Sequence, residues 1–326
     1  MREFTVLKND AGQRLDKFLS KALPALPPSL LYKSLRKKKI KVNRKRAEGN
    51  QMLAEGDTVQ LFLADEFFPD AVGVENEAEA LSRIKPHLSI LYEDAQIMLL
   101  NKPEGVLVHE DDDGNTDTLI RHVQAYLYQK GEYDPTAEQS FAPALCNRID
   151  RNTSGIVIAA KTAEALRVMA DKIRDREIDK FYLCAVHGRP EPREATLTAY
   201  HIKNEKEKTV RIFDRRLPGA KEIRTRYRTL AVRGDLSLLE VELLTGRTHQ
   251  IRAHMAHVGH PLVGDGKYGK NESDRKLGYR HQALCSYRLR FAFKTEAGVL
   301  SYLTGREFSI PKNEVYFTKD FFEGGR

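Results

Sequence analysis

The sequence predicts an α+β protein made of a small basic N-terminal domain and a larger body built on a mixed or antiparallel sheet. Three observations support this: charge is unevenly distributed, two helix patterns and a strand pattern follow one another near the N-terminus, and strand patterns in the body cluster without a regular βαβ repeat. The chain has 326 residues, enough for about two domains at roughly 150 residues each. With 41% hydrophobic and 31% charged residues, its composition is that of a globular protein.

Charge divides the chain into three parts. The first 62 residues carry 14 Lys and Arg against 6 Asp and Glu, the next 22 carry 1 against 6, and the remainder carry 39 against 34. We therefore expect a basic domain over residues 1–63, an acidic linker over 64–86 and a mildly basic body over 87–326. The basic domain favours a polyanionic partner, nucleic acid in particular, and a merely solvated basic surface is the alternative.

Within the basic domain, the sequence predicts two helices followed by a short sheet. Apolar residues recur at helical spacing from Leu15 to Leu23, and three prolines end this helix. Ser29 is the expected N-cap of a second helix. Alternation around Ile40 and Val42 predicts a half-buried strand, and apolar residues as far as Leu63 complete the sheet.

Eight cations lie within eleven residues of this domain, where they can follow the phosphates of a nucleic acid. They are Arg36, Lys37, Lys38, Lys39, Lys41, Arg44, Lys45 and Arg46. The order of R-L-D-x-F-L, K-x-I-x-V-N and E-G-D-x-V along the domain resembles the RNA-binding domain of the ribosomal protein S-four type. By this resemblance the eight cations bind RNA, and a small α+β domain with an incidentally basic loop is the alternative.

The body contains strand and helix patterns in mixed order. A hairpin is expected over residues 88–100, turning at Glu93 and Asp94. Further expected elements are helices over 118–130, 163–176 and 248–258, strands over 156–160, 181–186 and 236–244, a loop or edge segment over 143–151, and a turn at Ser154 and Gly155.

No segment is expected to enter a membrane. The longest apolar runs, such as residues 156–160, span a few residues, whereas a membrane helix needs about 20. The N-terminus also lacks the apolar core of a signal peptide.

The three cysteines favour a reducing, cytoplasmic compartment, because they are scattered and form no C-x-x-C pair. They are Cys146, Cys184 and Cys285. We expect a monomer.

In the first of two chemically distinctive segments, residues 147–162, a single aspartate stands among cations. Asp150 lies between Arg148 and Arg151, just before the expected turn and buried strand. Neighbouring cations favour the ionised form of a carboxyl group, and an ionised carboxylate can act as nucleophile or base. A structural ion pair is the commoner use of such a cluster and is the alternative.

The second segment, residues 244–265, contains four histidines within twelve residues. They are His249, His254, His257 and His260. This density suggests a metal, but H-E-x-x-H is absent and no carboxylate lies among the four, so we expect no metal site. The chain also lacks a P-loop and a dinucleotide-binding glycine fingerprint, so we expect no nucleotide cofactor.

Three motifs of the body agree with one known pattern. H-R-L-D-x-x-T-S-G is matched closely at residues 147–155, K-x-Y at 180–182, and G-R-T-H-Q-I-R-x-H-x-x-x-x-G-H-P-L-x-G-D at 246–265. The pattern resembles the RluA family of RNA pseudouridine synthases, and with the basic domain the resemblance covers nearly the whole chain. Two positions depart from it: Asn147 replaces a usual histidine, and Asn152 stands where aspartate is common. We expect these departures to affect substrate preference more than the reaction.

The resemblance implies an isomerase that converts uridine in RNA to pseudouridine. The uracil leaves the ribose, rotates and rejoins through a ring carbon, with no redox change and no cofactor. By the resemblance, Asp150 is the essential carboxylate, Tyr182 stacks on the target base and helps remove a proton, and Arg252 pairs with Asp150. Arg151 and Arg247 hold phosphates or support the flipped nucleotide. Taken alone, Tyr182 also fits a core strand position.

Several alternatives remain open at this stage. Asp150 can attack the sugar, attack the base or remove a sugar proton. The basic domain is typical of family members that act on large-subunit ribosomal RNA, which is the expected substrate. A transfer-RNA pseudouridine synthase is one alternative. An RNA-binding ribosome-assembly factor without catalysis is another, and the presence of Asp150, Tyr182 and Arg252 argues against it.

Overall fold

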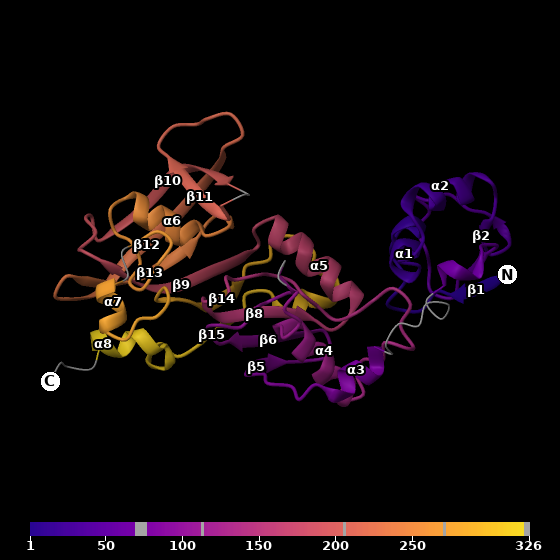
Figure 1. The fold of residues 1–326 in the computed structure, drawn as a ribbon, viewed down its shortest axis with the longest axis horizontal. Coiled ribbons are helices and arrows are strands. Elements are labelled where there is room, and N and C mark those ends of the chain that lie inside the picture. Colours follow the sequence, from indigo (N-terminus) through magenta and orange to yellow (C-terminus); the bar gives the residue numbers. More distant parts are fainter. Residues whose placement is uncertain (69–76, 112–113, 205–206, 270–271, 323–326) are drawn as a thin grey trace.

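The computed structural model describes residues 1–68, 77–111, 114–204, 207–269 and 272–322. The middle of the predicted acidic linker therefore lies outside the described residues. The basic domain, called the head below, forms a small unit at one end of the molecule, and the body extends from it around one long sheet (Figure 1). Among the described helices, none is both long and apolar enough to cross a membrane.

The head is a four-stranded antiparallel sheet packed against two helices. The helices are α1 (Leu15–Ala22) and α2 (Pro28–Arg36), and the strands follow the order β1 (Arg2–Thr5), β4 (Thr58–Leu61), β2 (Ile40–Val42) and β3 (Lys45–Arg46). Fully buried apolar side chains from both layers, such as Phe18 and Val59, form a core that belongs to the head alone. The predicted α+β head is confirmed.

Two details of the head differ from the expectation. Helix α2 begins at Pro28, so Ser29 lies inside the first turn and does not cap it. Proline suits this position because the first N–H groups of a helix have no partner within it. Strand β1 was not predicted, since four residues with Phe4 as their single large apolar side chain make too short a pattern. Backbone pairing with β4 holds this strand in place.

Within the described residues, the body contains one 11-stranded sheet, mixed because β14 and β8 run parallel while the other pairs are antiparallel. Its order is β11 (Thr209–Phe213), β10 (Glu194–Asn204), β12 (Lys221–Arg233), β13 (Leu236–Leu243), β9 (Ile178–His187), β14 (Leu284–Phe291), β8 (Ser154–Ala160), β6 (Ile97–Lys102) and β5 (Ile90–Glu93), with β15 (Glu307–Ser309) on β14 and β7 (Ala144–Leu145) on β8. The predicted mixed sheet is confirmed.

Helices cover both faces of the sheet. They are α3 (Glu77–Arg83), α4 (Leu119–Gln129), α5 (Ala163–Arg174), α6 (Gln250–His257), α7 (Glu272–Lys276) and α8 (Lys319–Phe322). Short 3-10 turns of the body lie at Gly298–Leu303, Lys312–Glu314 and Tyr316–Thr318, and one at Asp65–Phe67 belongs to the head. In β8, Ile156 and Ile158 join the core that contains α5, whereas Val157 and Ala159 join the core that contains α4 and α6. Burial on both faces explains the uninterrupted apolar run of this strand.

Ser154 and Gly155 belong to β8 and do not form the expected turn. Gly155 has φ +113° and pairs with Ser286 of the parallel strand β14. A Cβ at this position would lie 2.2 Å from the Ser286 carbonyl oxygen, so only glycine permits this approach. The contact lies on a distant strand, which explains why the local Ser-Gly pattern was mistaken for a turn. It also determines where the Asp150 loop enters the sheet.

The two described ends of the predicted linker are parts of the domains that they join. Phe68 is buried in the core of the head, and Leu81 of α3 is buried in the core of the body beside α4.

Head and body also meet directly, through polar contacts. The Asp10 carboxylate accepts hydrogen bonds from the backbone N–H and the hydroxyl of Ser140, at 3.1 and 2.6 Å. The side-chain carbonyl of Asn9 accepts one from the N–H of Ala163, at the start of α5, at 3.2 Å.

Candidate active site

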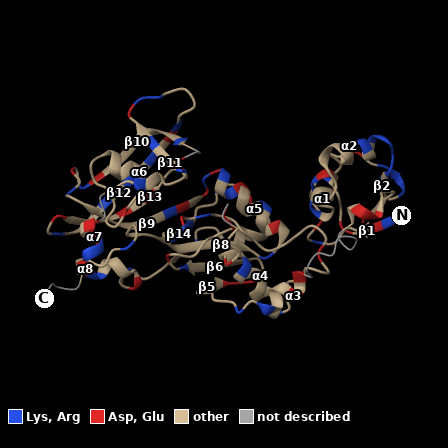
Figure 2. Cartoon of the chain, in the orientation of Figure 1, with Lys and Arg blue, Asp and Glu red and all other residues tan. Residues whose placement is uncertain are grey.

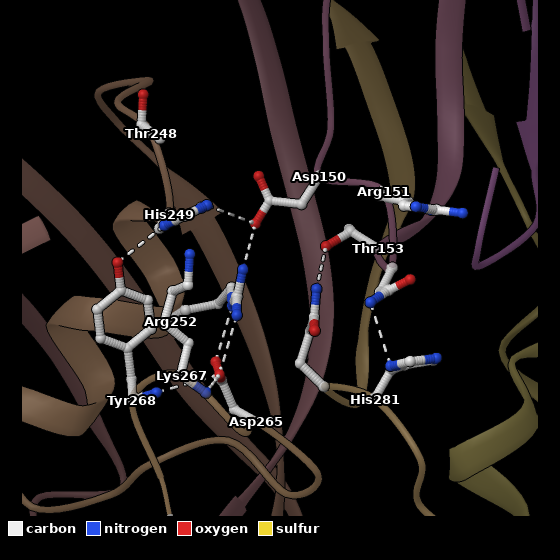
Figure 3. Close-up of polar contacts among 12 residues, drawn as sticks. Asp150, Arg151, Thr153, Thr248, His249, Arg252, Asp265, Lys267, Tyr268 and His281 are labelled. Carbon is white, nitrogen blue, oxygen red and sulfur yellow. Dashed lines mark hydrogen bonds and ion pairs between the residues drawn. The ribbon is translucent and has the colours of Figure 1, made fainter. Parts of the chain in front are cut away.

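The structure brings Asp150, Arg252 and Asp265 together near the start of β8, an interior strand of the sheet. Asp150 lies in the loop between β7 and β8, Arg252 in α6, and Asp265 in the loop that follows α6. Arg252 donates from Nη1 to Asp150 Oδ2 at 2.8 Å, and from Nε and Nη2 to the two oxygens of Asp265 at 2.7 and 2.9 Å (Figure 3). The side chain of Asp150 is 27% exposed, whereas that of Asp265 is 0% exposed. Arg252 therefore anchors an accessible carboxylate to a buried one.

The charges of Arg252 and Asp265 stabilise each other. Burial alone would lower the pKa of Arg252, but its hydrogen bonds and charge interactions with Asp265 and Asp150 outweigh burial and raise that pKa. Burial opposes ionisation of Asp265, yet the hydrogen bonds from Arg252 hold the pKa of Asp265 below its ordinary value. Both groups thus stay charged at neutral pH, and Asp150 always faces a cation.

His249 also faces Asp150. Its Nε2 lies 3.8 Å from Asp150 Oδ2, and its Nδ1 lies 2.8 Å from the hydroxyl of Tyr268 (Figure 3). Because the Tyr268 hydroxyl already accepts the N–H of Val210, its own proton is available to Nδ1. The ring proton of neutral His249 then sits on Nε2, directed at Asp150. Burial lowers the pKa of His249, which favours this neutral form.

Tyr182 lies on β9, 7% exposed, in the core cluster that includes residues of α4 and α6. Burial, with a smaller contribution from the charge of Asp150, raises the pKa of Tyr182 to about 12. The hydroxyl keeps its proton at neutral pH. Tyr182 is thus a core aromatic of the body, and its role toward the target base stays a prediction.

Arg151 points away from Asp150 (Figure 3), and its Nε donates to the carbonyl of Gly105 at 3.0 Å. The backbone carbonyl of Arg151 accepts a hydrogen bond from Lys102 Nζ at 2.8 Å. Lys102 is fully buried and also donates to the carbonyls of Pro103 and Val106, at 2.7 and 2.9 Å. Burial lowers the pKa of Lys102 to about 8. This lysine therefore fastens the Asp150 loop to the turn after β6.

The four histidines of the second segment have four different partners. The ring of His249 contacts the Tyr268 hydroxyl, as described above. The ring of His254 forms a hydrogen bond with the Thr225 hydroxyl. The ring of His257 contacts the Asp214 carboxylate, and the ring of His260 contacts the His187 carbonyl. Within the described ranges, no three His, Cys, Asp or Glu side chains gather closely enough to hold a metal ion.

The remaining predicted RNA-binding residues form no ion pair with Asp150 among the described contacts. Arg247 is exposed on the loop before α6. The eight cations of residues 36–46 lie on α2, β2, β3 and their connections, on the side of the head away from the body (Figure 2). Seven of them are exposed, and Lys41 is half-buried.

Similarity to known proteins identifies the family. Residues 96–257 match the family described as RNA pseudouridylate synthase, and residues 13–59 match the S4 domain. The ribosomal large subunit pseudouridine synthase C of Haemophilus ducreyi is 32% identical over 291 residues, which cover 88% of this chain and 87% of the relative. The protein of the same name from Escherichia coli K12 is 34% identical over 283 residues, covering 83% and 81%. The chain belongs to the RNA pseudouridine synthases of the RluA family.

Solved structures show that the fold is also that of pseudouridine synthases. Human RNA pseudouridylate synthase domain containing 1 covers 72% of this chain and 97% of its own length, with a TM-score of 0.52 and 23% identity. Human RNA pseudouridylate synthase domain containing 4 covers 74% and 94%, with a TM-score of 0.55 and 21% identity. The expected enzyme class, an isomerase with an S4 head, is confirmed.

Two residues that depart from the family pattern of pseudouridine synthases have structural partners. The side-chain carbonyl of Asn147 accepts the N–H of Ile158 in β8 at 2.8 Å. The Asn152 amide lies 3.1 Å from a ring nitrogen of His281. Neither side chain has a hydrogen bond to Asp150 within the described structure.

Sequence reasoning missed four residues around the pseudouridine synthase site: Lys102, His249, Asp265 and Tyr268. Three of them lie inside motifs that the sequence displayed, in N-K-P-E-G, T-H-Q-I-R and the final D of H-P-L-x-G-D. Their motif positions were visible, but their partners were not. Tyr268 carries no local signal, since its role depends on a hydrogen bond to His249 across a loop.

Proposed function

We propose that this protein isomerises specific uridines of large-subunit ribosomal RNA to pseudouridine, and that Asp150 is its reacting carboxylate. The observation that carries the proposal is the asymmetry of Asp150. Arg252 and His249 both approach Oδ2, whereas Oδ1 receives no hydrogen bond from any described residue. Figure 3 shows Oδ1 turned away from both partners. One oxygen is thus held in place, and the other is free to meet the ribose or base.

The neighbouring residues then have distinct roles. Arg252 holds and directs Asp150 through its hydrogen bond to Oδ2, and Tyr182 contacts the target base. Because the pKa of Tyr182 is about 12, its hydroxyl is protonated at neutral pH in the substrate-free protein, which favours stacking over proton removal as its role. The overall reaction is balanced without a co-reactant, since C5 of uracil loses one proton and N1 gains one.

The choice of ribosomal RNA rests on two facts. Relatives at 32–34% identity over more than four fifths of the chain are named ribosomal large subunit pseudouridine synthases. The S4 head adds a second, strongly basic surface, which suits a large folded RNA.

We also infer that the enzyme works as a monomer in the cytoplasm. Asp150, Tyr182 and Arg252 all come from one chain. The three cysteines are free, and burial raises the pKa of Cys146 to about 12 and that of Cys285 to about 11, so neither thiol is activated.

The test uses Asp150→Asn, which keeps the side-chain volume and removes the charge. The variant and the unaltered protein are incubated with unmodified transcripts of large-subunit ribosomal RNA and of transfer RNA, and pseudouridine is mapped at each position. We expect product in the ribosomal transcript and a loss of at least about 10³-fold in the variant, since a positioned acid, base or nucleophile contributes about 10²–10⁴-fold.

Affinity for the ribosomal transcript should change little, because most of it comes from phosphate contacts. Product mainly in transfer RNA would contradict the proposed substrate. Binding without any product would favour an assembly factor, and substantial activity of the variant would refute the role of Asp150.

A further inference from the structure

A cationic groove lies beside the Asp150 site, on the part of the sheet farthest from the head. It consists of two adjoining hollows of about 440 and 370 Å³ that share Lys221 and Arg247 as lining residues. The walls are β10, the connection from β11 to β12, and the loop that precedes α6.

Four cations from separate parts of the chain meet at the larger hollow. They are Arg176, Arg216, Lys221 and Arg247. None of them forms an ion pair with another described residue, and Glu222 is the one carboxylate among the described lining residues. Three of the four arginines of strand β12 are ion-paired by contrast: Arg226 with Glu242, Arg228 with Glu240 and Arg233 with Asp320. Unpaired like charges around a hollow repel one another and attract an anionic ligand.

The groove also contains an aromatic side chain. Tyr200 of β10 lines the larger hollow and is half-buried. Cations combined with an accessible aromatic ring suit single-stranded nucleic acid, since the cations meet phosphates and the ring stacks on a base.

The groove is joined rigidly to the catalytic site. Thr248 lines the smaller hollow and directly precedes His249, the neighbour of Asp150 (Figure 3). The N–H of Arg247 donates to the buried Gln250 side chain at 3.2 Å, which ties the loop to α6. On the other wall, Asp214 bonds His257 of the same helix at 2.7 Å. One short helix thus positions Arg252 toward Asp150 and holds both walls of the groove.

We propose that this groove binds the single-stranded RNA backbone next to the target uridine. Arg176, Arg216 and Lys221 contact phosphates, and Tyr200 stacks on a neighbouring base. The inference rests on the proposed function, because the groove begins at the residue that adjoins the Asp150 site.

The test compares two triple variants that each lose three positive charges. The groove variant carries Arg176→Asn, Arg216→Gln and Lys221→Gln, with Asn chosen because Arg176 has φ +59°, which asparagine tolerates. The control variant carries Arg226→Gln, Arg233→Gln and Arg290→Gln, three cations that are ion-paired outside the groove. Each is titrated against a labelled 20-nucleotide single-stranded RNA with a central uridine, at several salt concentrations.

The groove variant should bind this RNA at least about tenfold more weakly, with a log–log salt slope that is flatter by about 2, from roughly 0.7 per phosphate contact. The control should match the unaltered protein. Tyr200→Ala should weaken binding by about fivefold or more without changing the slope, as expected for a lost stacking contact. A variant with Arg176→Lys, Arg216→Lys and Lys221→Arg should keep the slope, which excludes misfolding as the cause.

Equal affinity and slope for the groove variant and the control would overturn the proposal. Pseudouridine formation by the unaltered protein tests the proposed function separately from the affinity of the groove variant. If the unaltered protein makes no pseudouridine but the groove variant still loses affinity, the substrate assignment fails and the groove remains an RNA site. If the protein is active and the groove variant binds normally, the groove proposal fails alone.

Discussion

Cations of the head and of the proposed catalytic site are the same residue types in opposite environments. The eight cations of residues 36–46 lie at the surface, and no described carboxylate forms an ion pair with any of them. Arg252 is buried between Asp150 and Asp265, with three hydrogen bonds to the two carboxylates. Exposed charges act over a distance and are screened by salt, whereas a buried pair is screened much less. The first group is suited to attract RNA, and the second to hold one reactive atom in place.

The largest difference between the regions should appear when a single arginine is truncated. Arg252→Ala leaves Asp265 buried without its partner, which costs about 3–5 kcal/mol of unfolding free energy. Arg36→Ala, on the exposed end of α2, should change stability by no more than about 0.5 kcal/mol. Urea unfolding of both variants measures the contrast, and similar losses would show that Arg252 is not a structural anchor.

Acidification from pH 6.5 toward 4 should destabilise the body more than the head. All ten histidines lie in the body, and burial lowers the pKa of His254 from 6.5 to about 4. A depressed histidine pKa means that the unfolded chain binds the extra proton. The stability from this group is therefore complete above pH 6.5 and is lost as pH falls toward 4, a change of about 3 kcal/mol.

Unfolding followed at several pH values tests this expectation. His254→Gln should reduce the pH dependence in this window, and a variant with unchanged pH dependence would contradict the assignment.

Neutralising part of the basic head should change RNA affinity but not turnover. In a variant with Lys37, Lys38 and Lys39 each replaced by Gln, the log–log salt slope for ribosomal transcript binding should be flatter by about 2. The rate at saturating RNA should stay within about twofold of the unaltered protein, because no catalytic group lies in the head. Filter binding and single-turnover kinetics measure the two quantities. The control is the variant with Arg226→Gln, Arg233→Gln and Arg290→Gln. If the head variant has a salt slope as steep as this control, the cations of the head are only a solvated surface.

The smallest expected effect concerns His249. His249→Gln places an amide N–H near the position of Nε2, so it keeps a donor that faces Asp150. His249→Asn places its amide near the position of Nδ1, so it keeps a partner for Tyr268 and loses the donor toward Asp150. We expect the Asn variant to lose up to about tenfold in turnover, the worth of about one hydrogen bond, and the Gln variant to stay within about twofold. The reverse order would show that the bond to Tyr268 matters more than the donor toward Asp150.

Local patterns predicted much of the fold and part of the site. The helices around residues 118–130 and 163–176 were visible because their apolar spacing is strong, and they appear as α4 and α5. Strand β1 and the glycine contact at Gly155 were missed because each depends on a partner strand far along the chain. The cationic groove was missed for the same reason, since three separate segments contribute its charges.

Sequence motifs and the family resemblance thus predicted the domain plan, the enzyme class and the three candidate site residues Asp150, Tyr182 and Arg252. These depend on motifs and periodicities that lie within short stretches of chain. Tertiary structure alone decided that Arg252 links Asp150 to Asp265, that one oxygen of Asp150 is left free, and that a groove adjoins the site. Such features depend on distances between segments that meet only when the sheet has formed and burial has strengthened their electrostatic interactions.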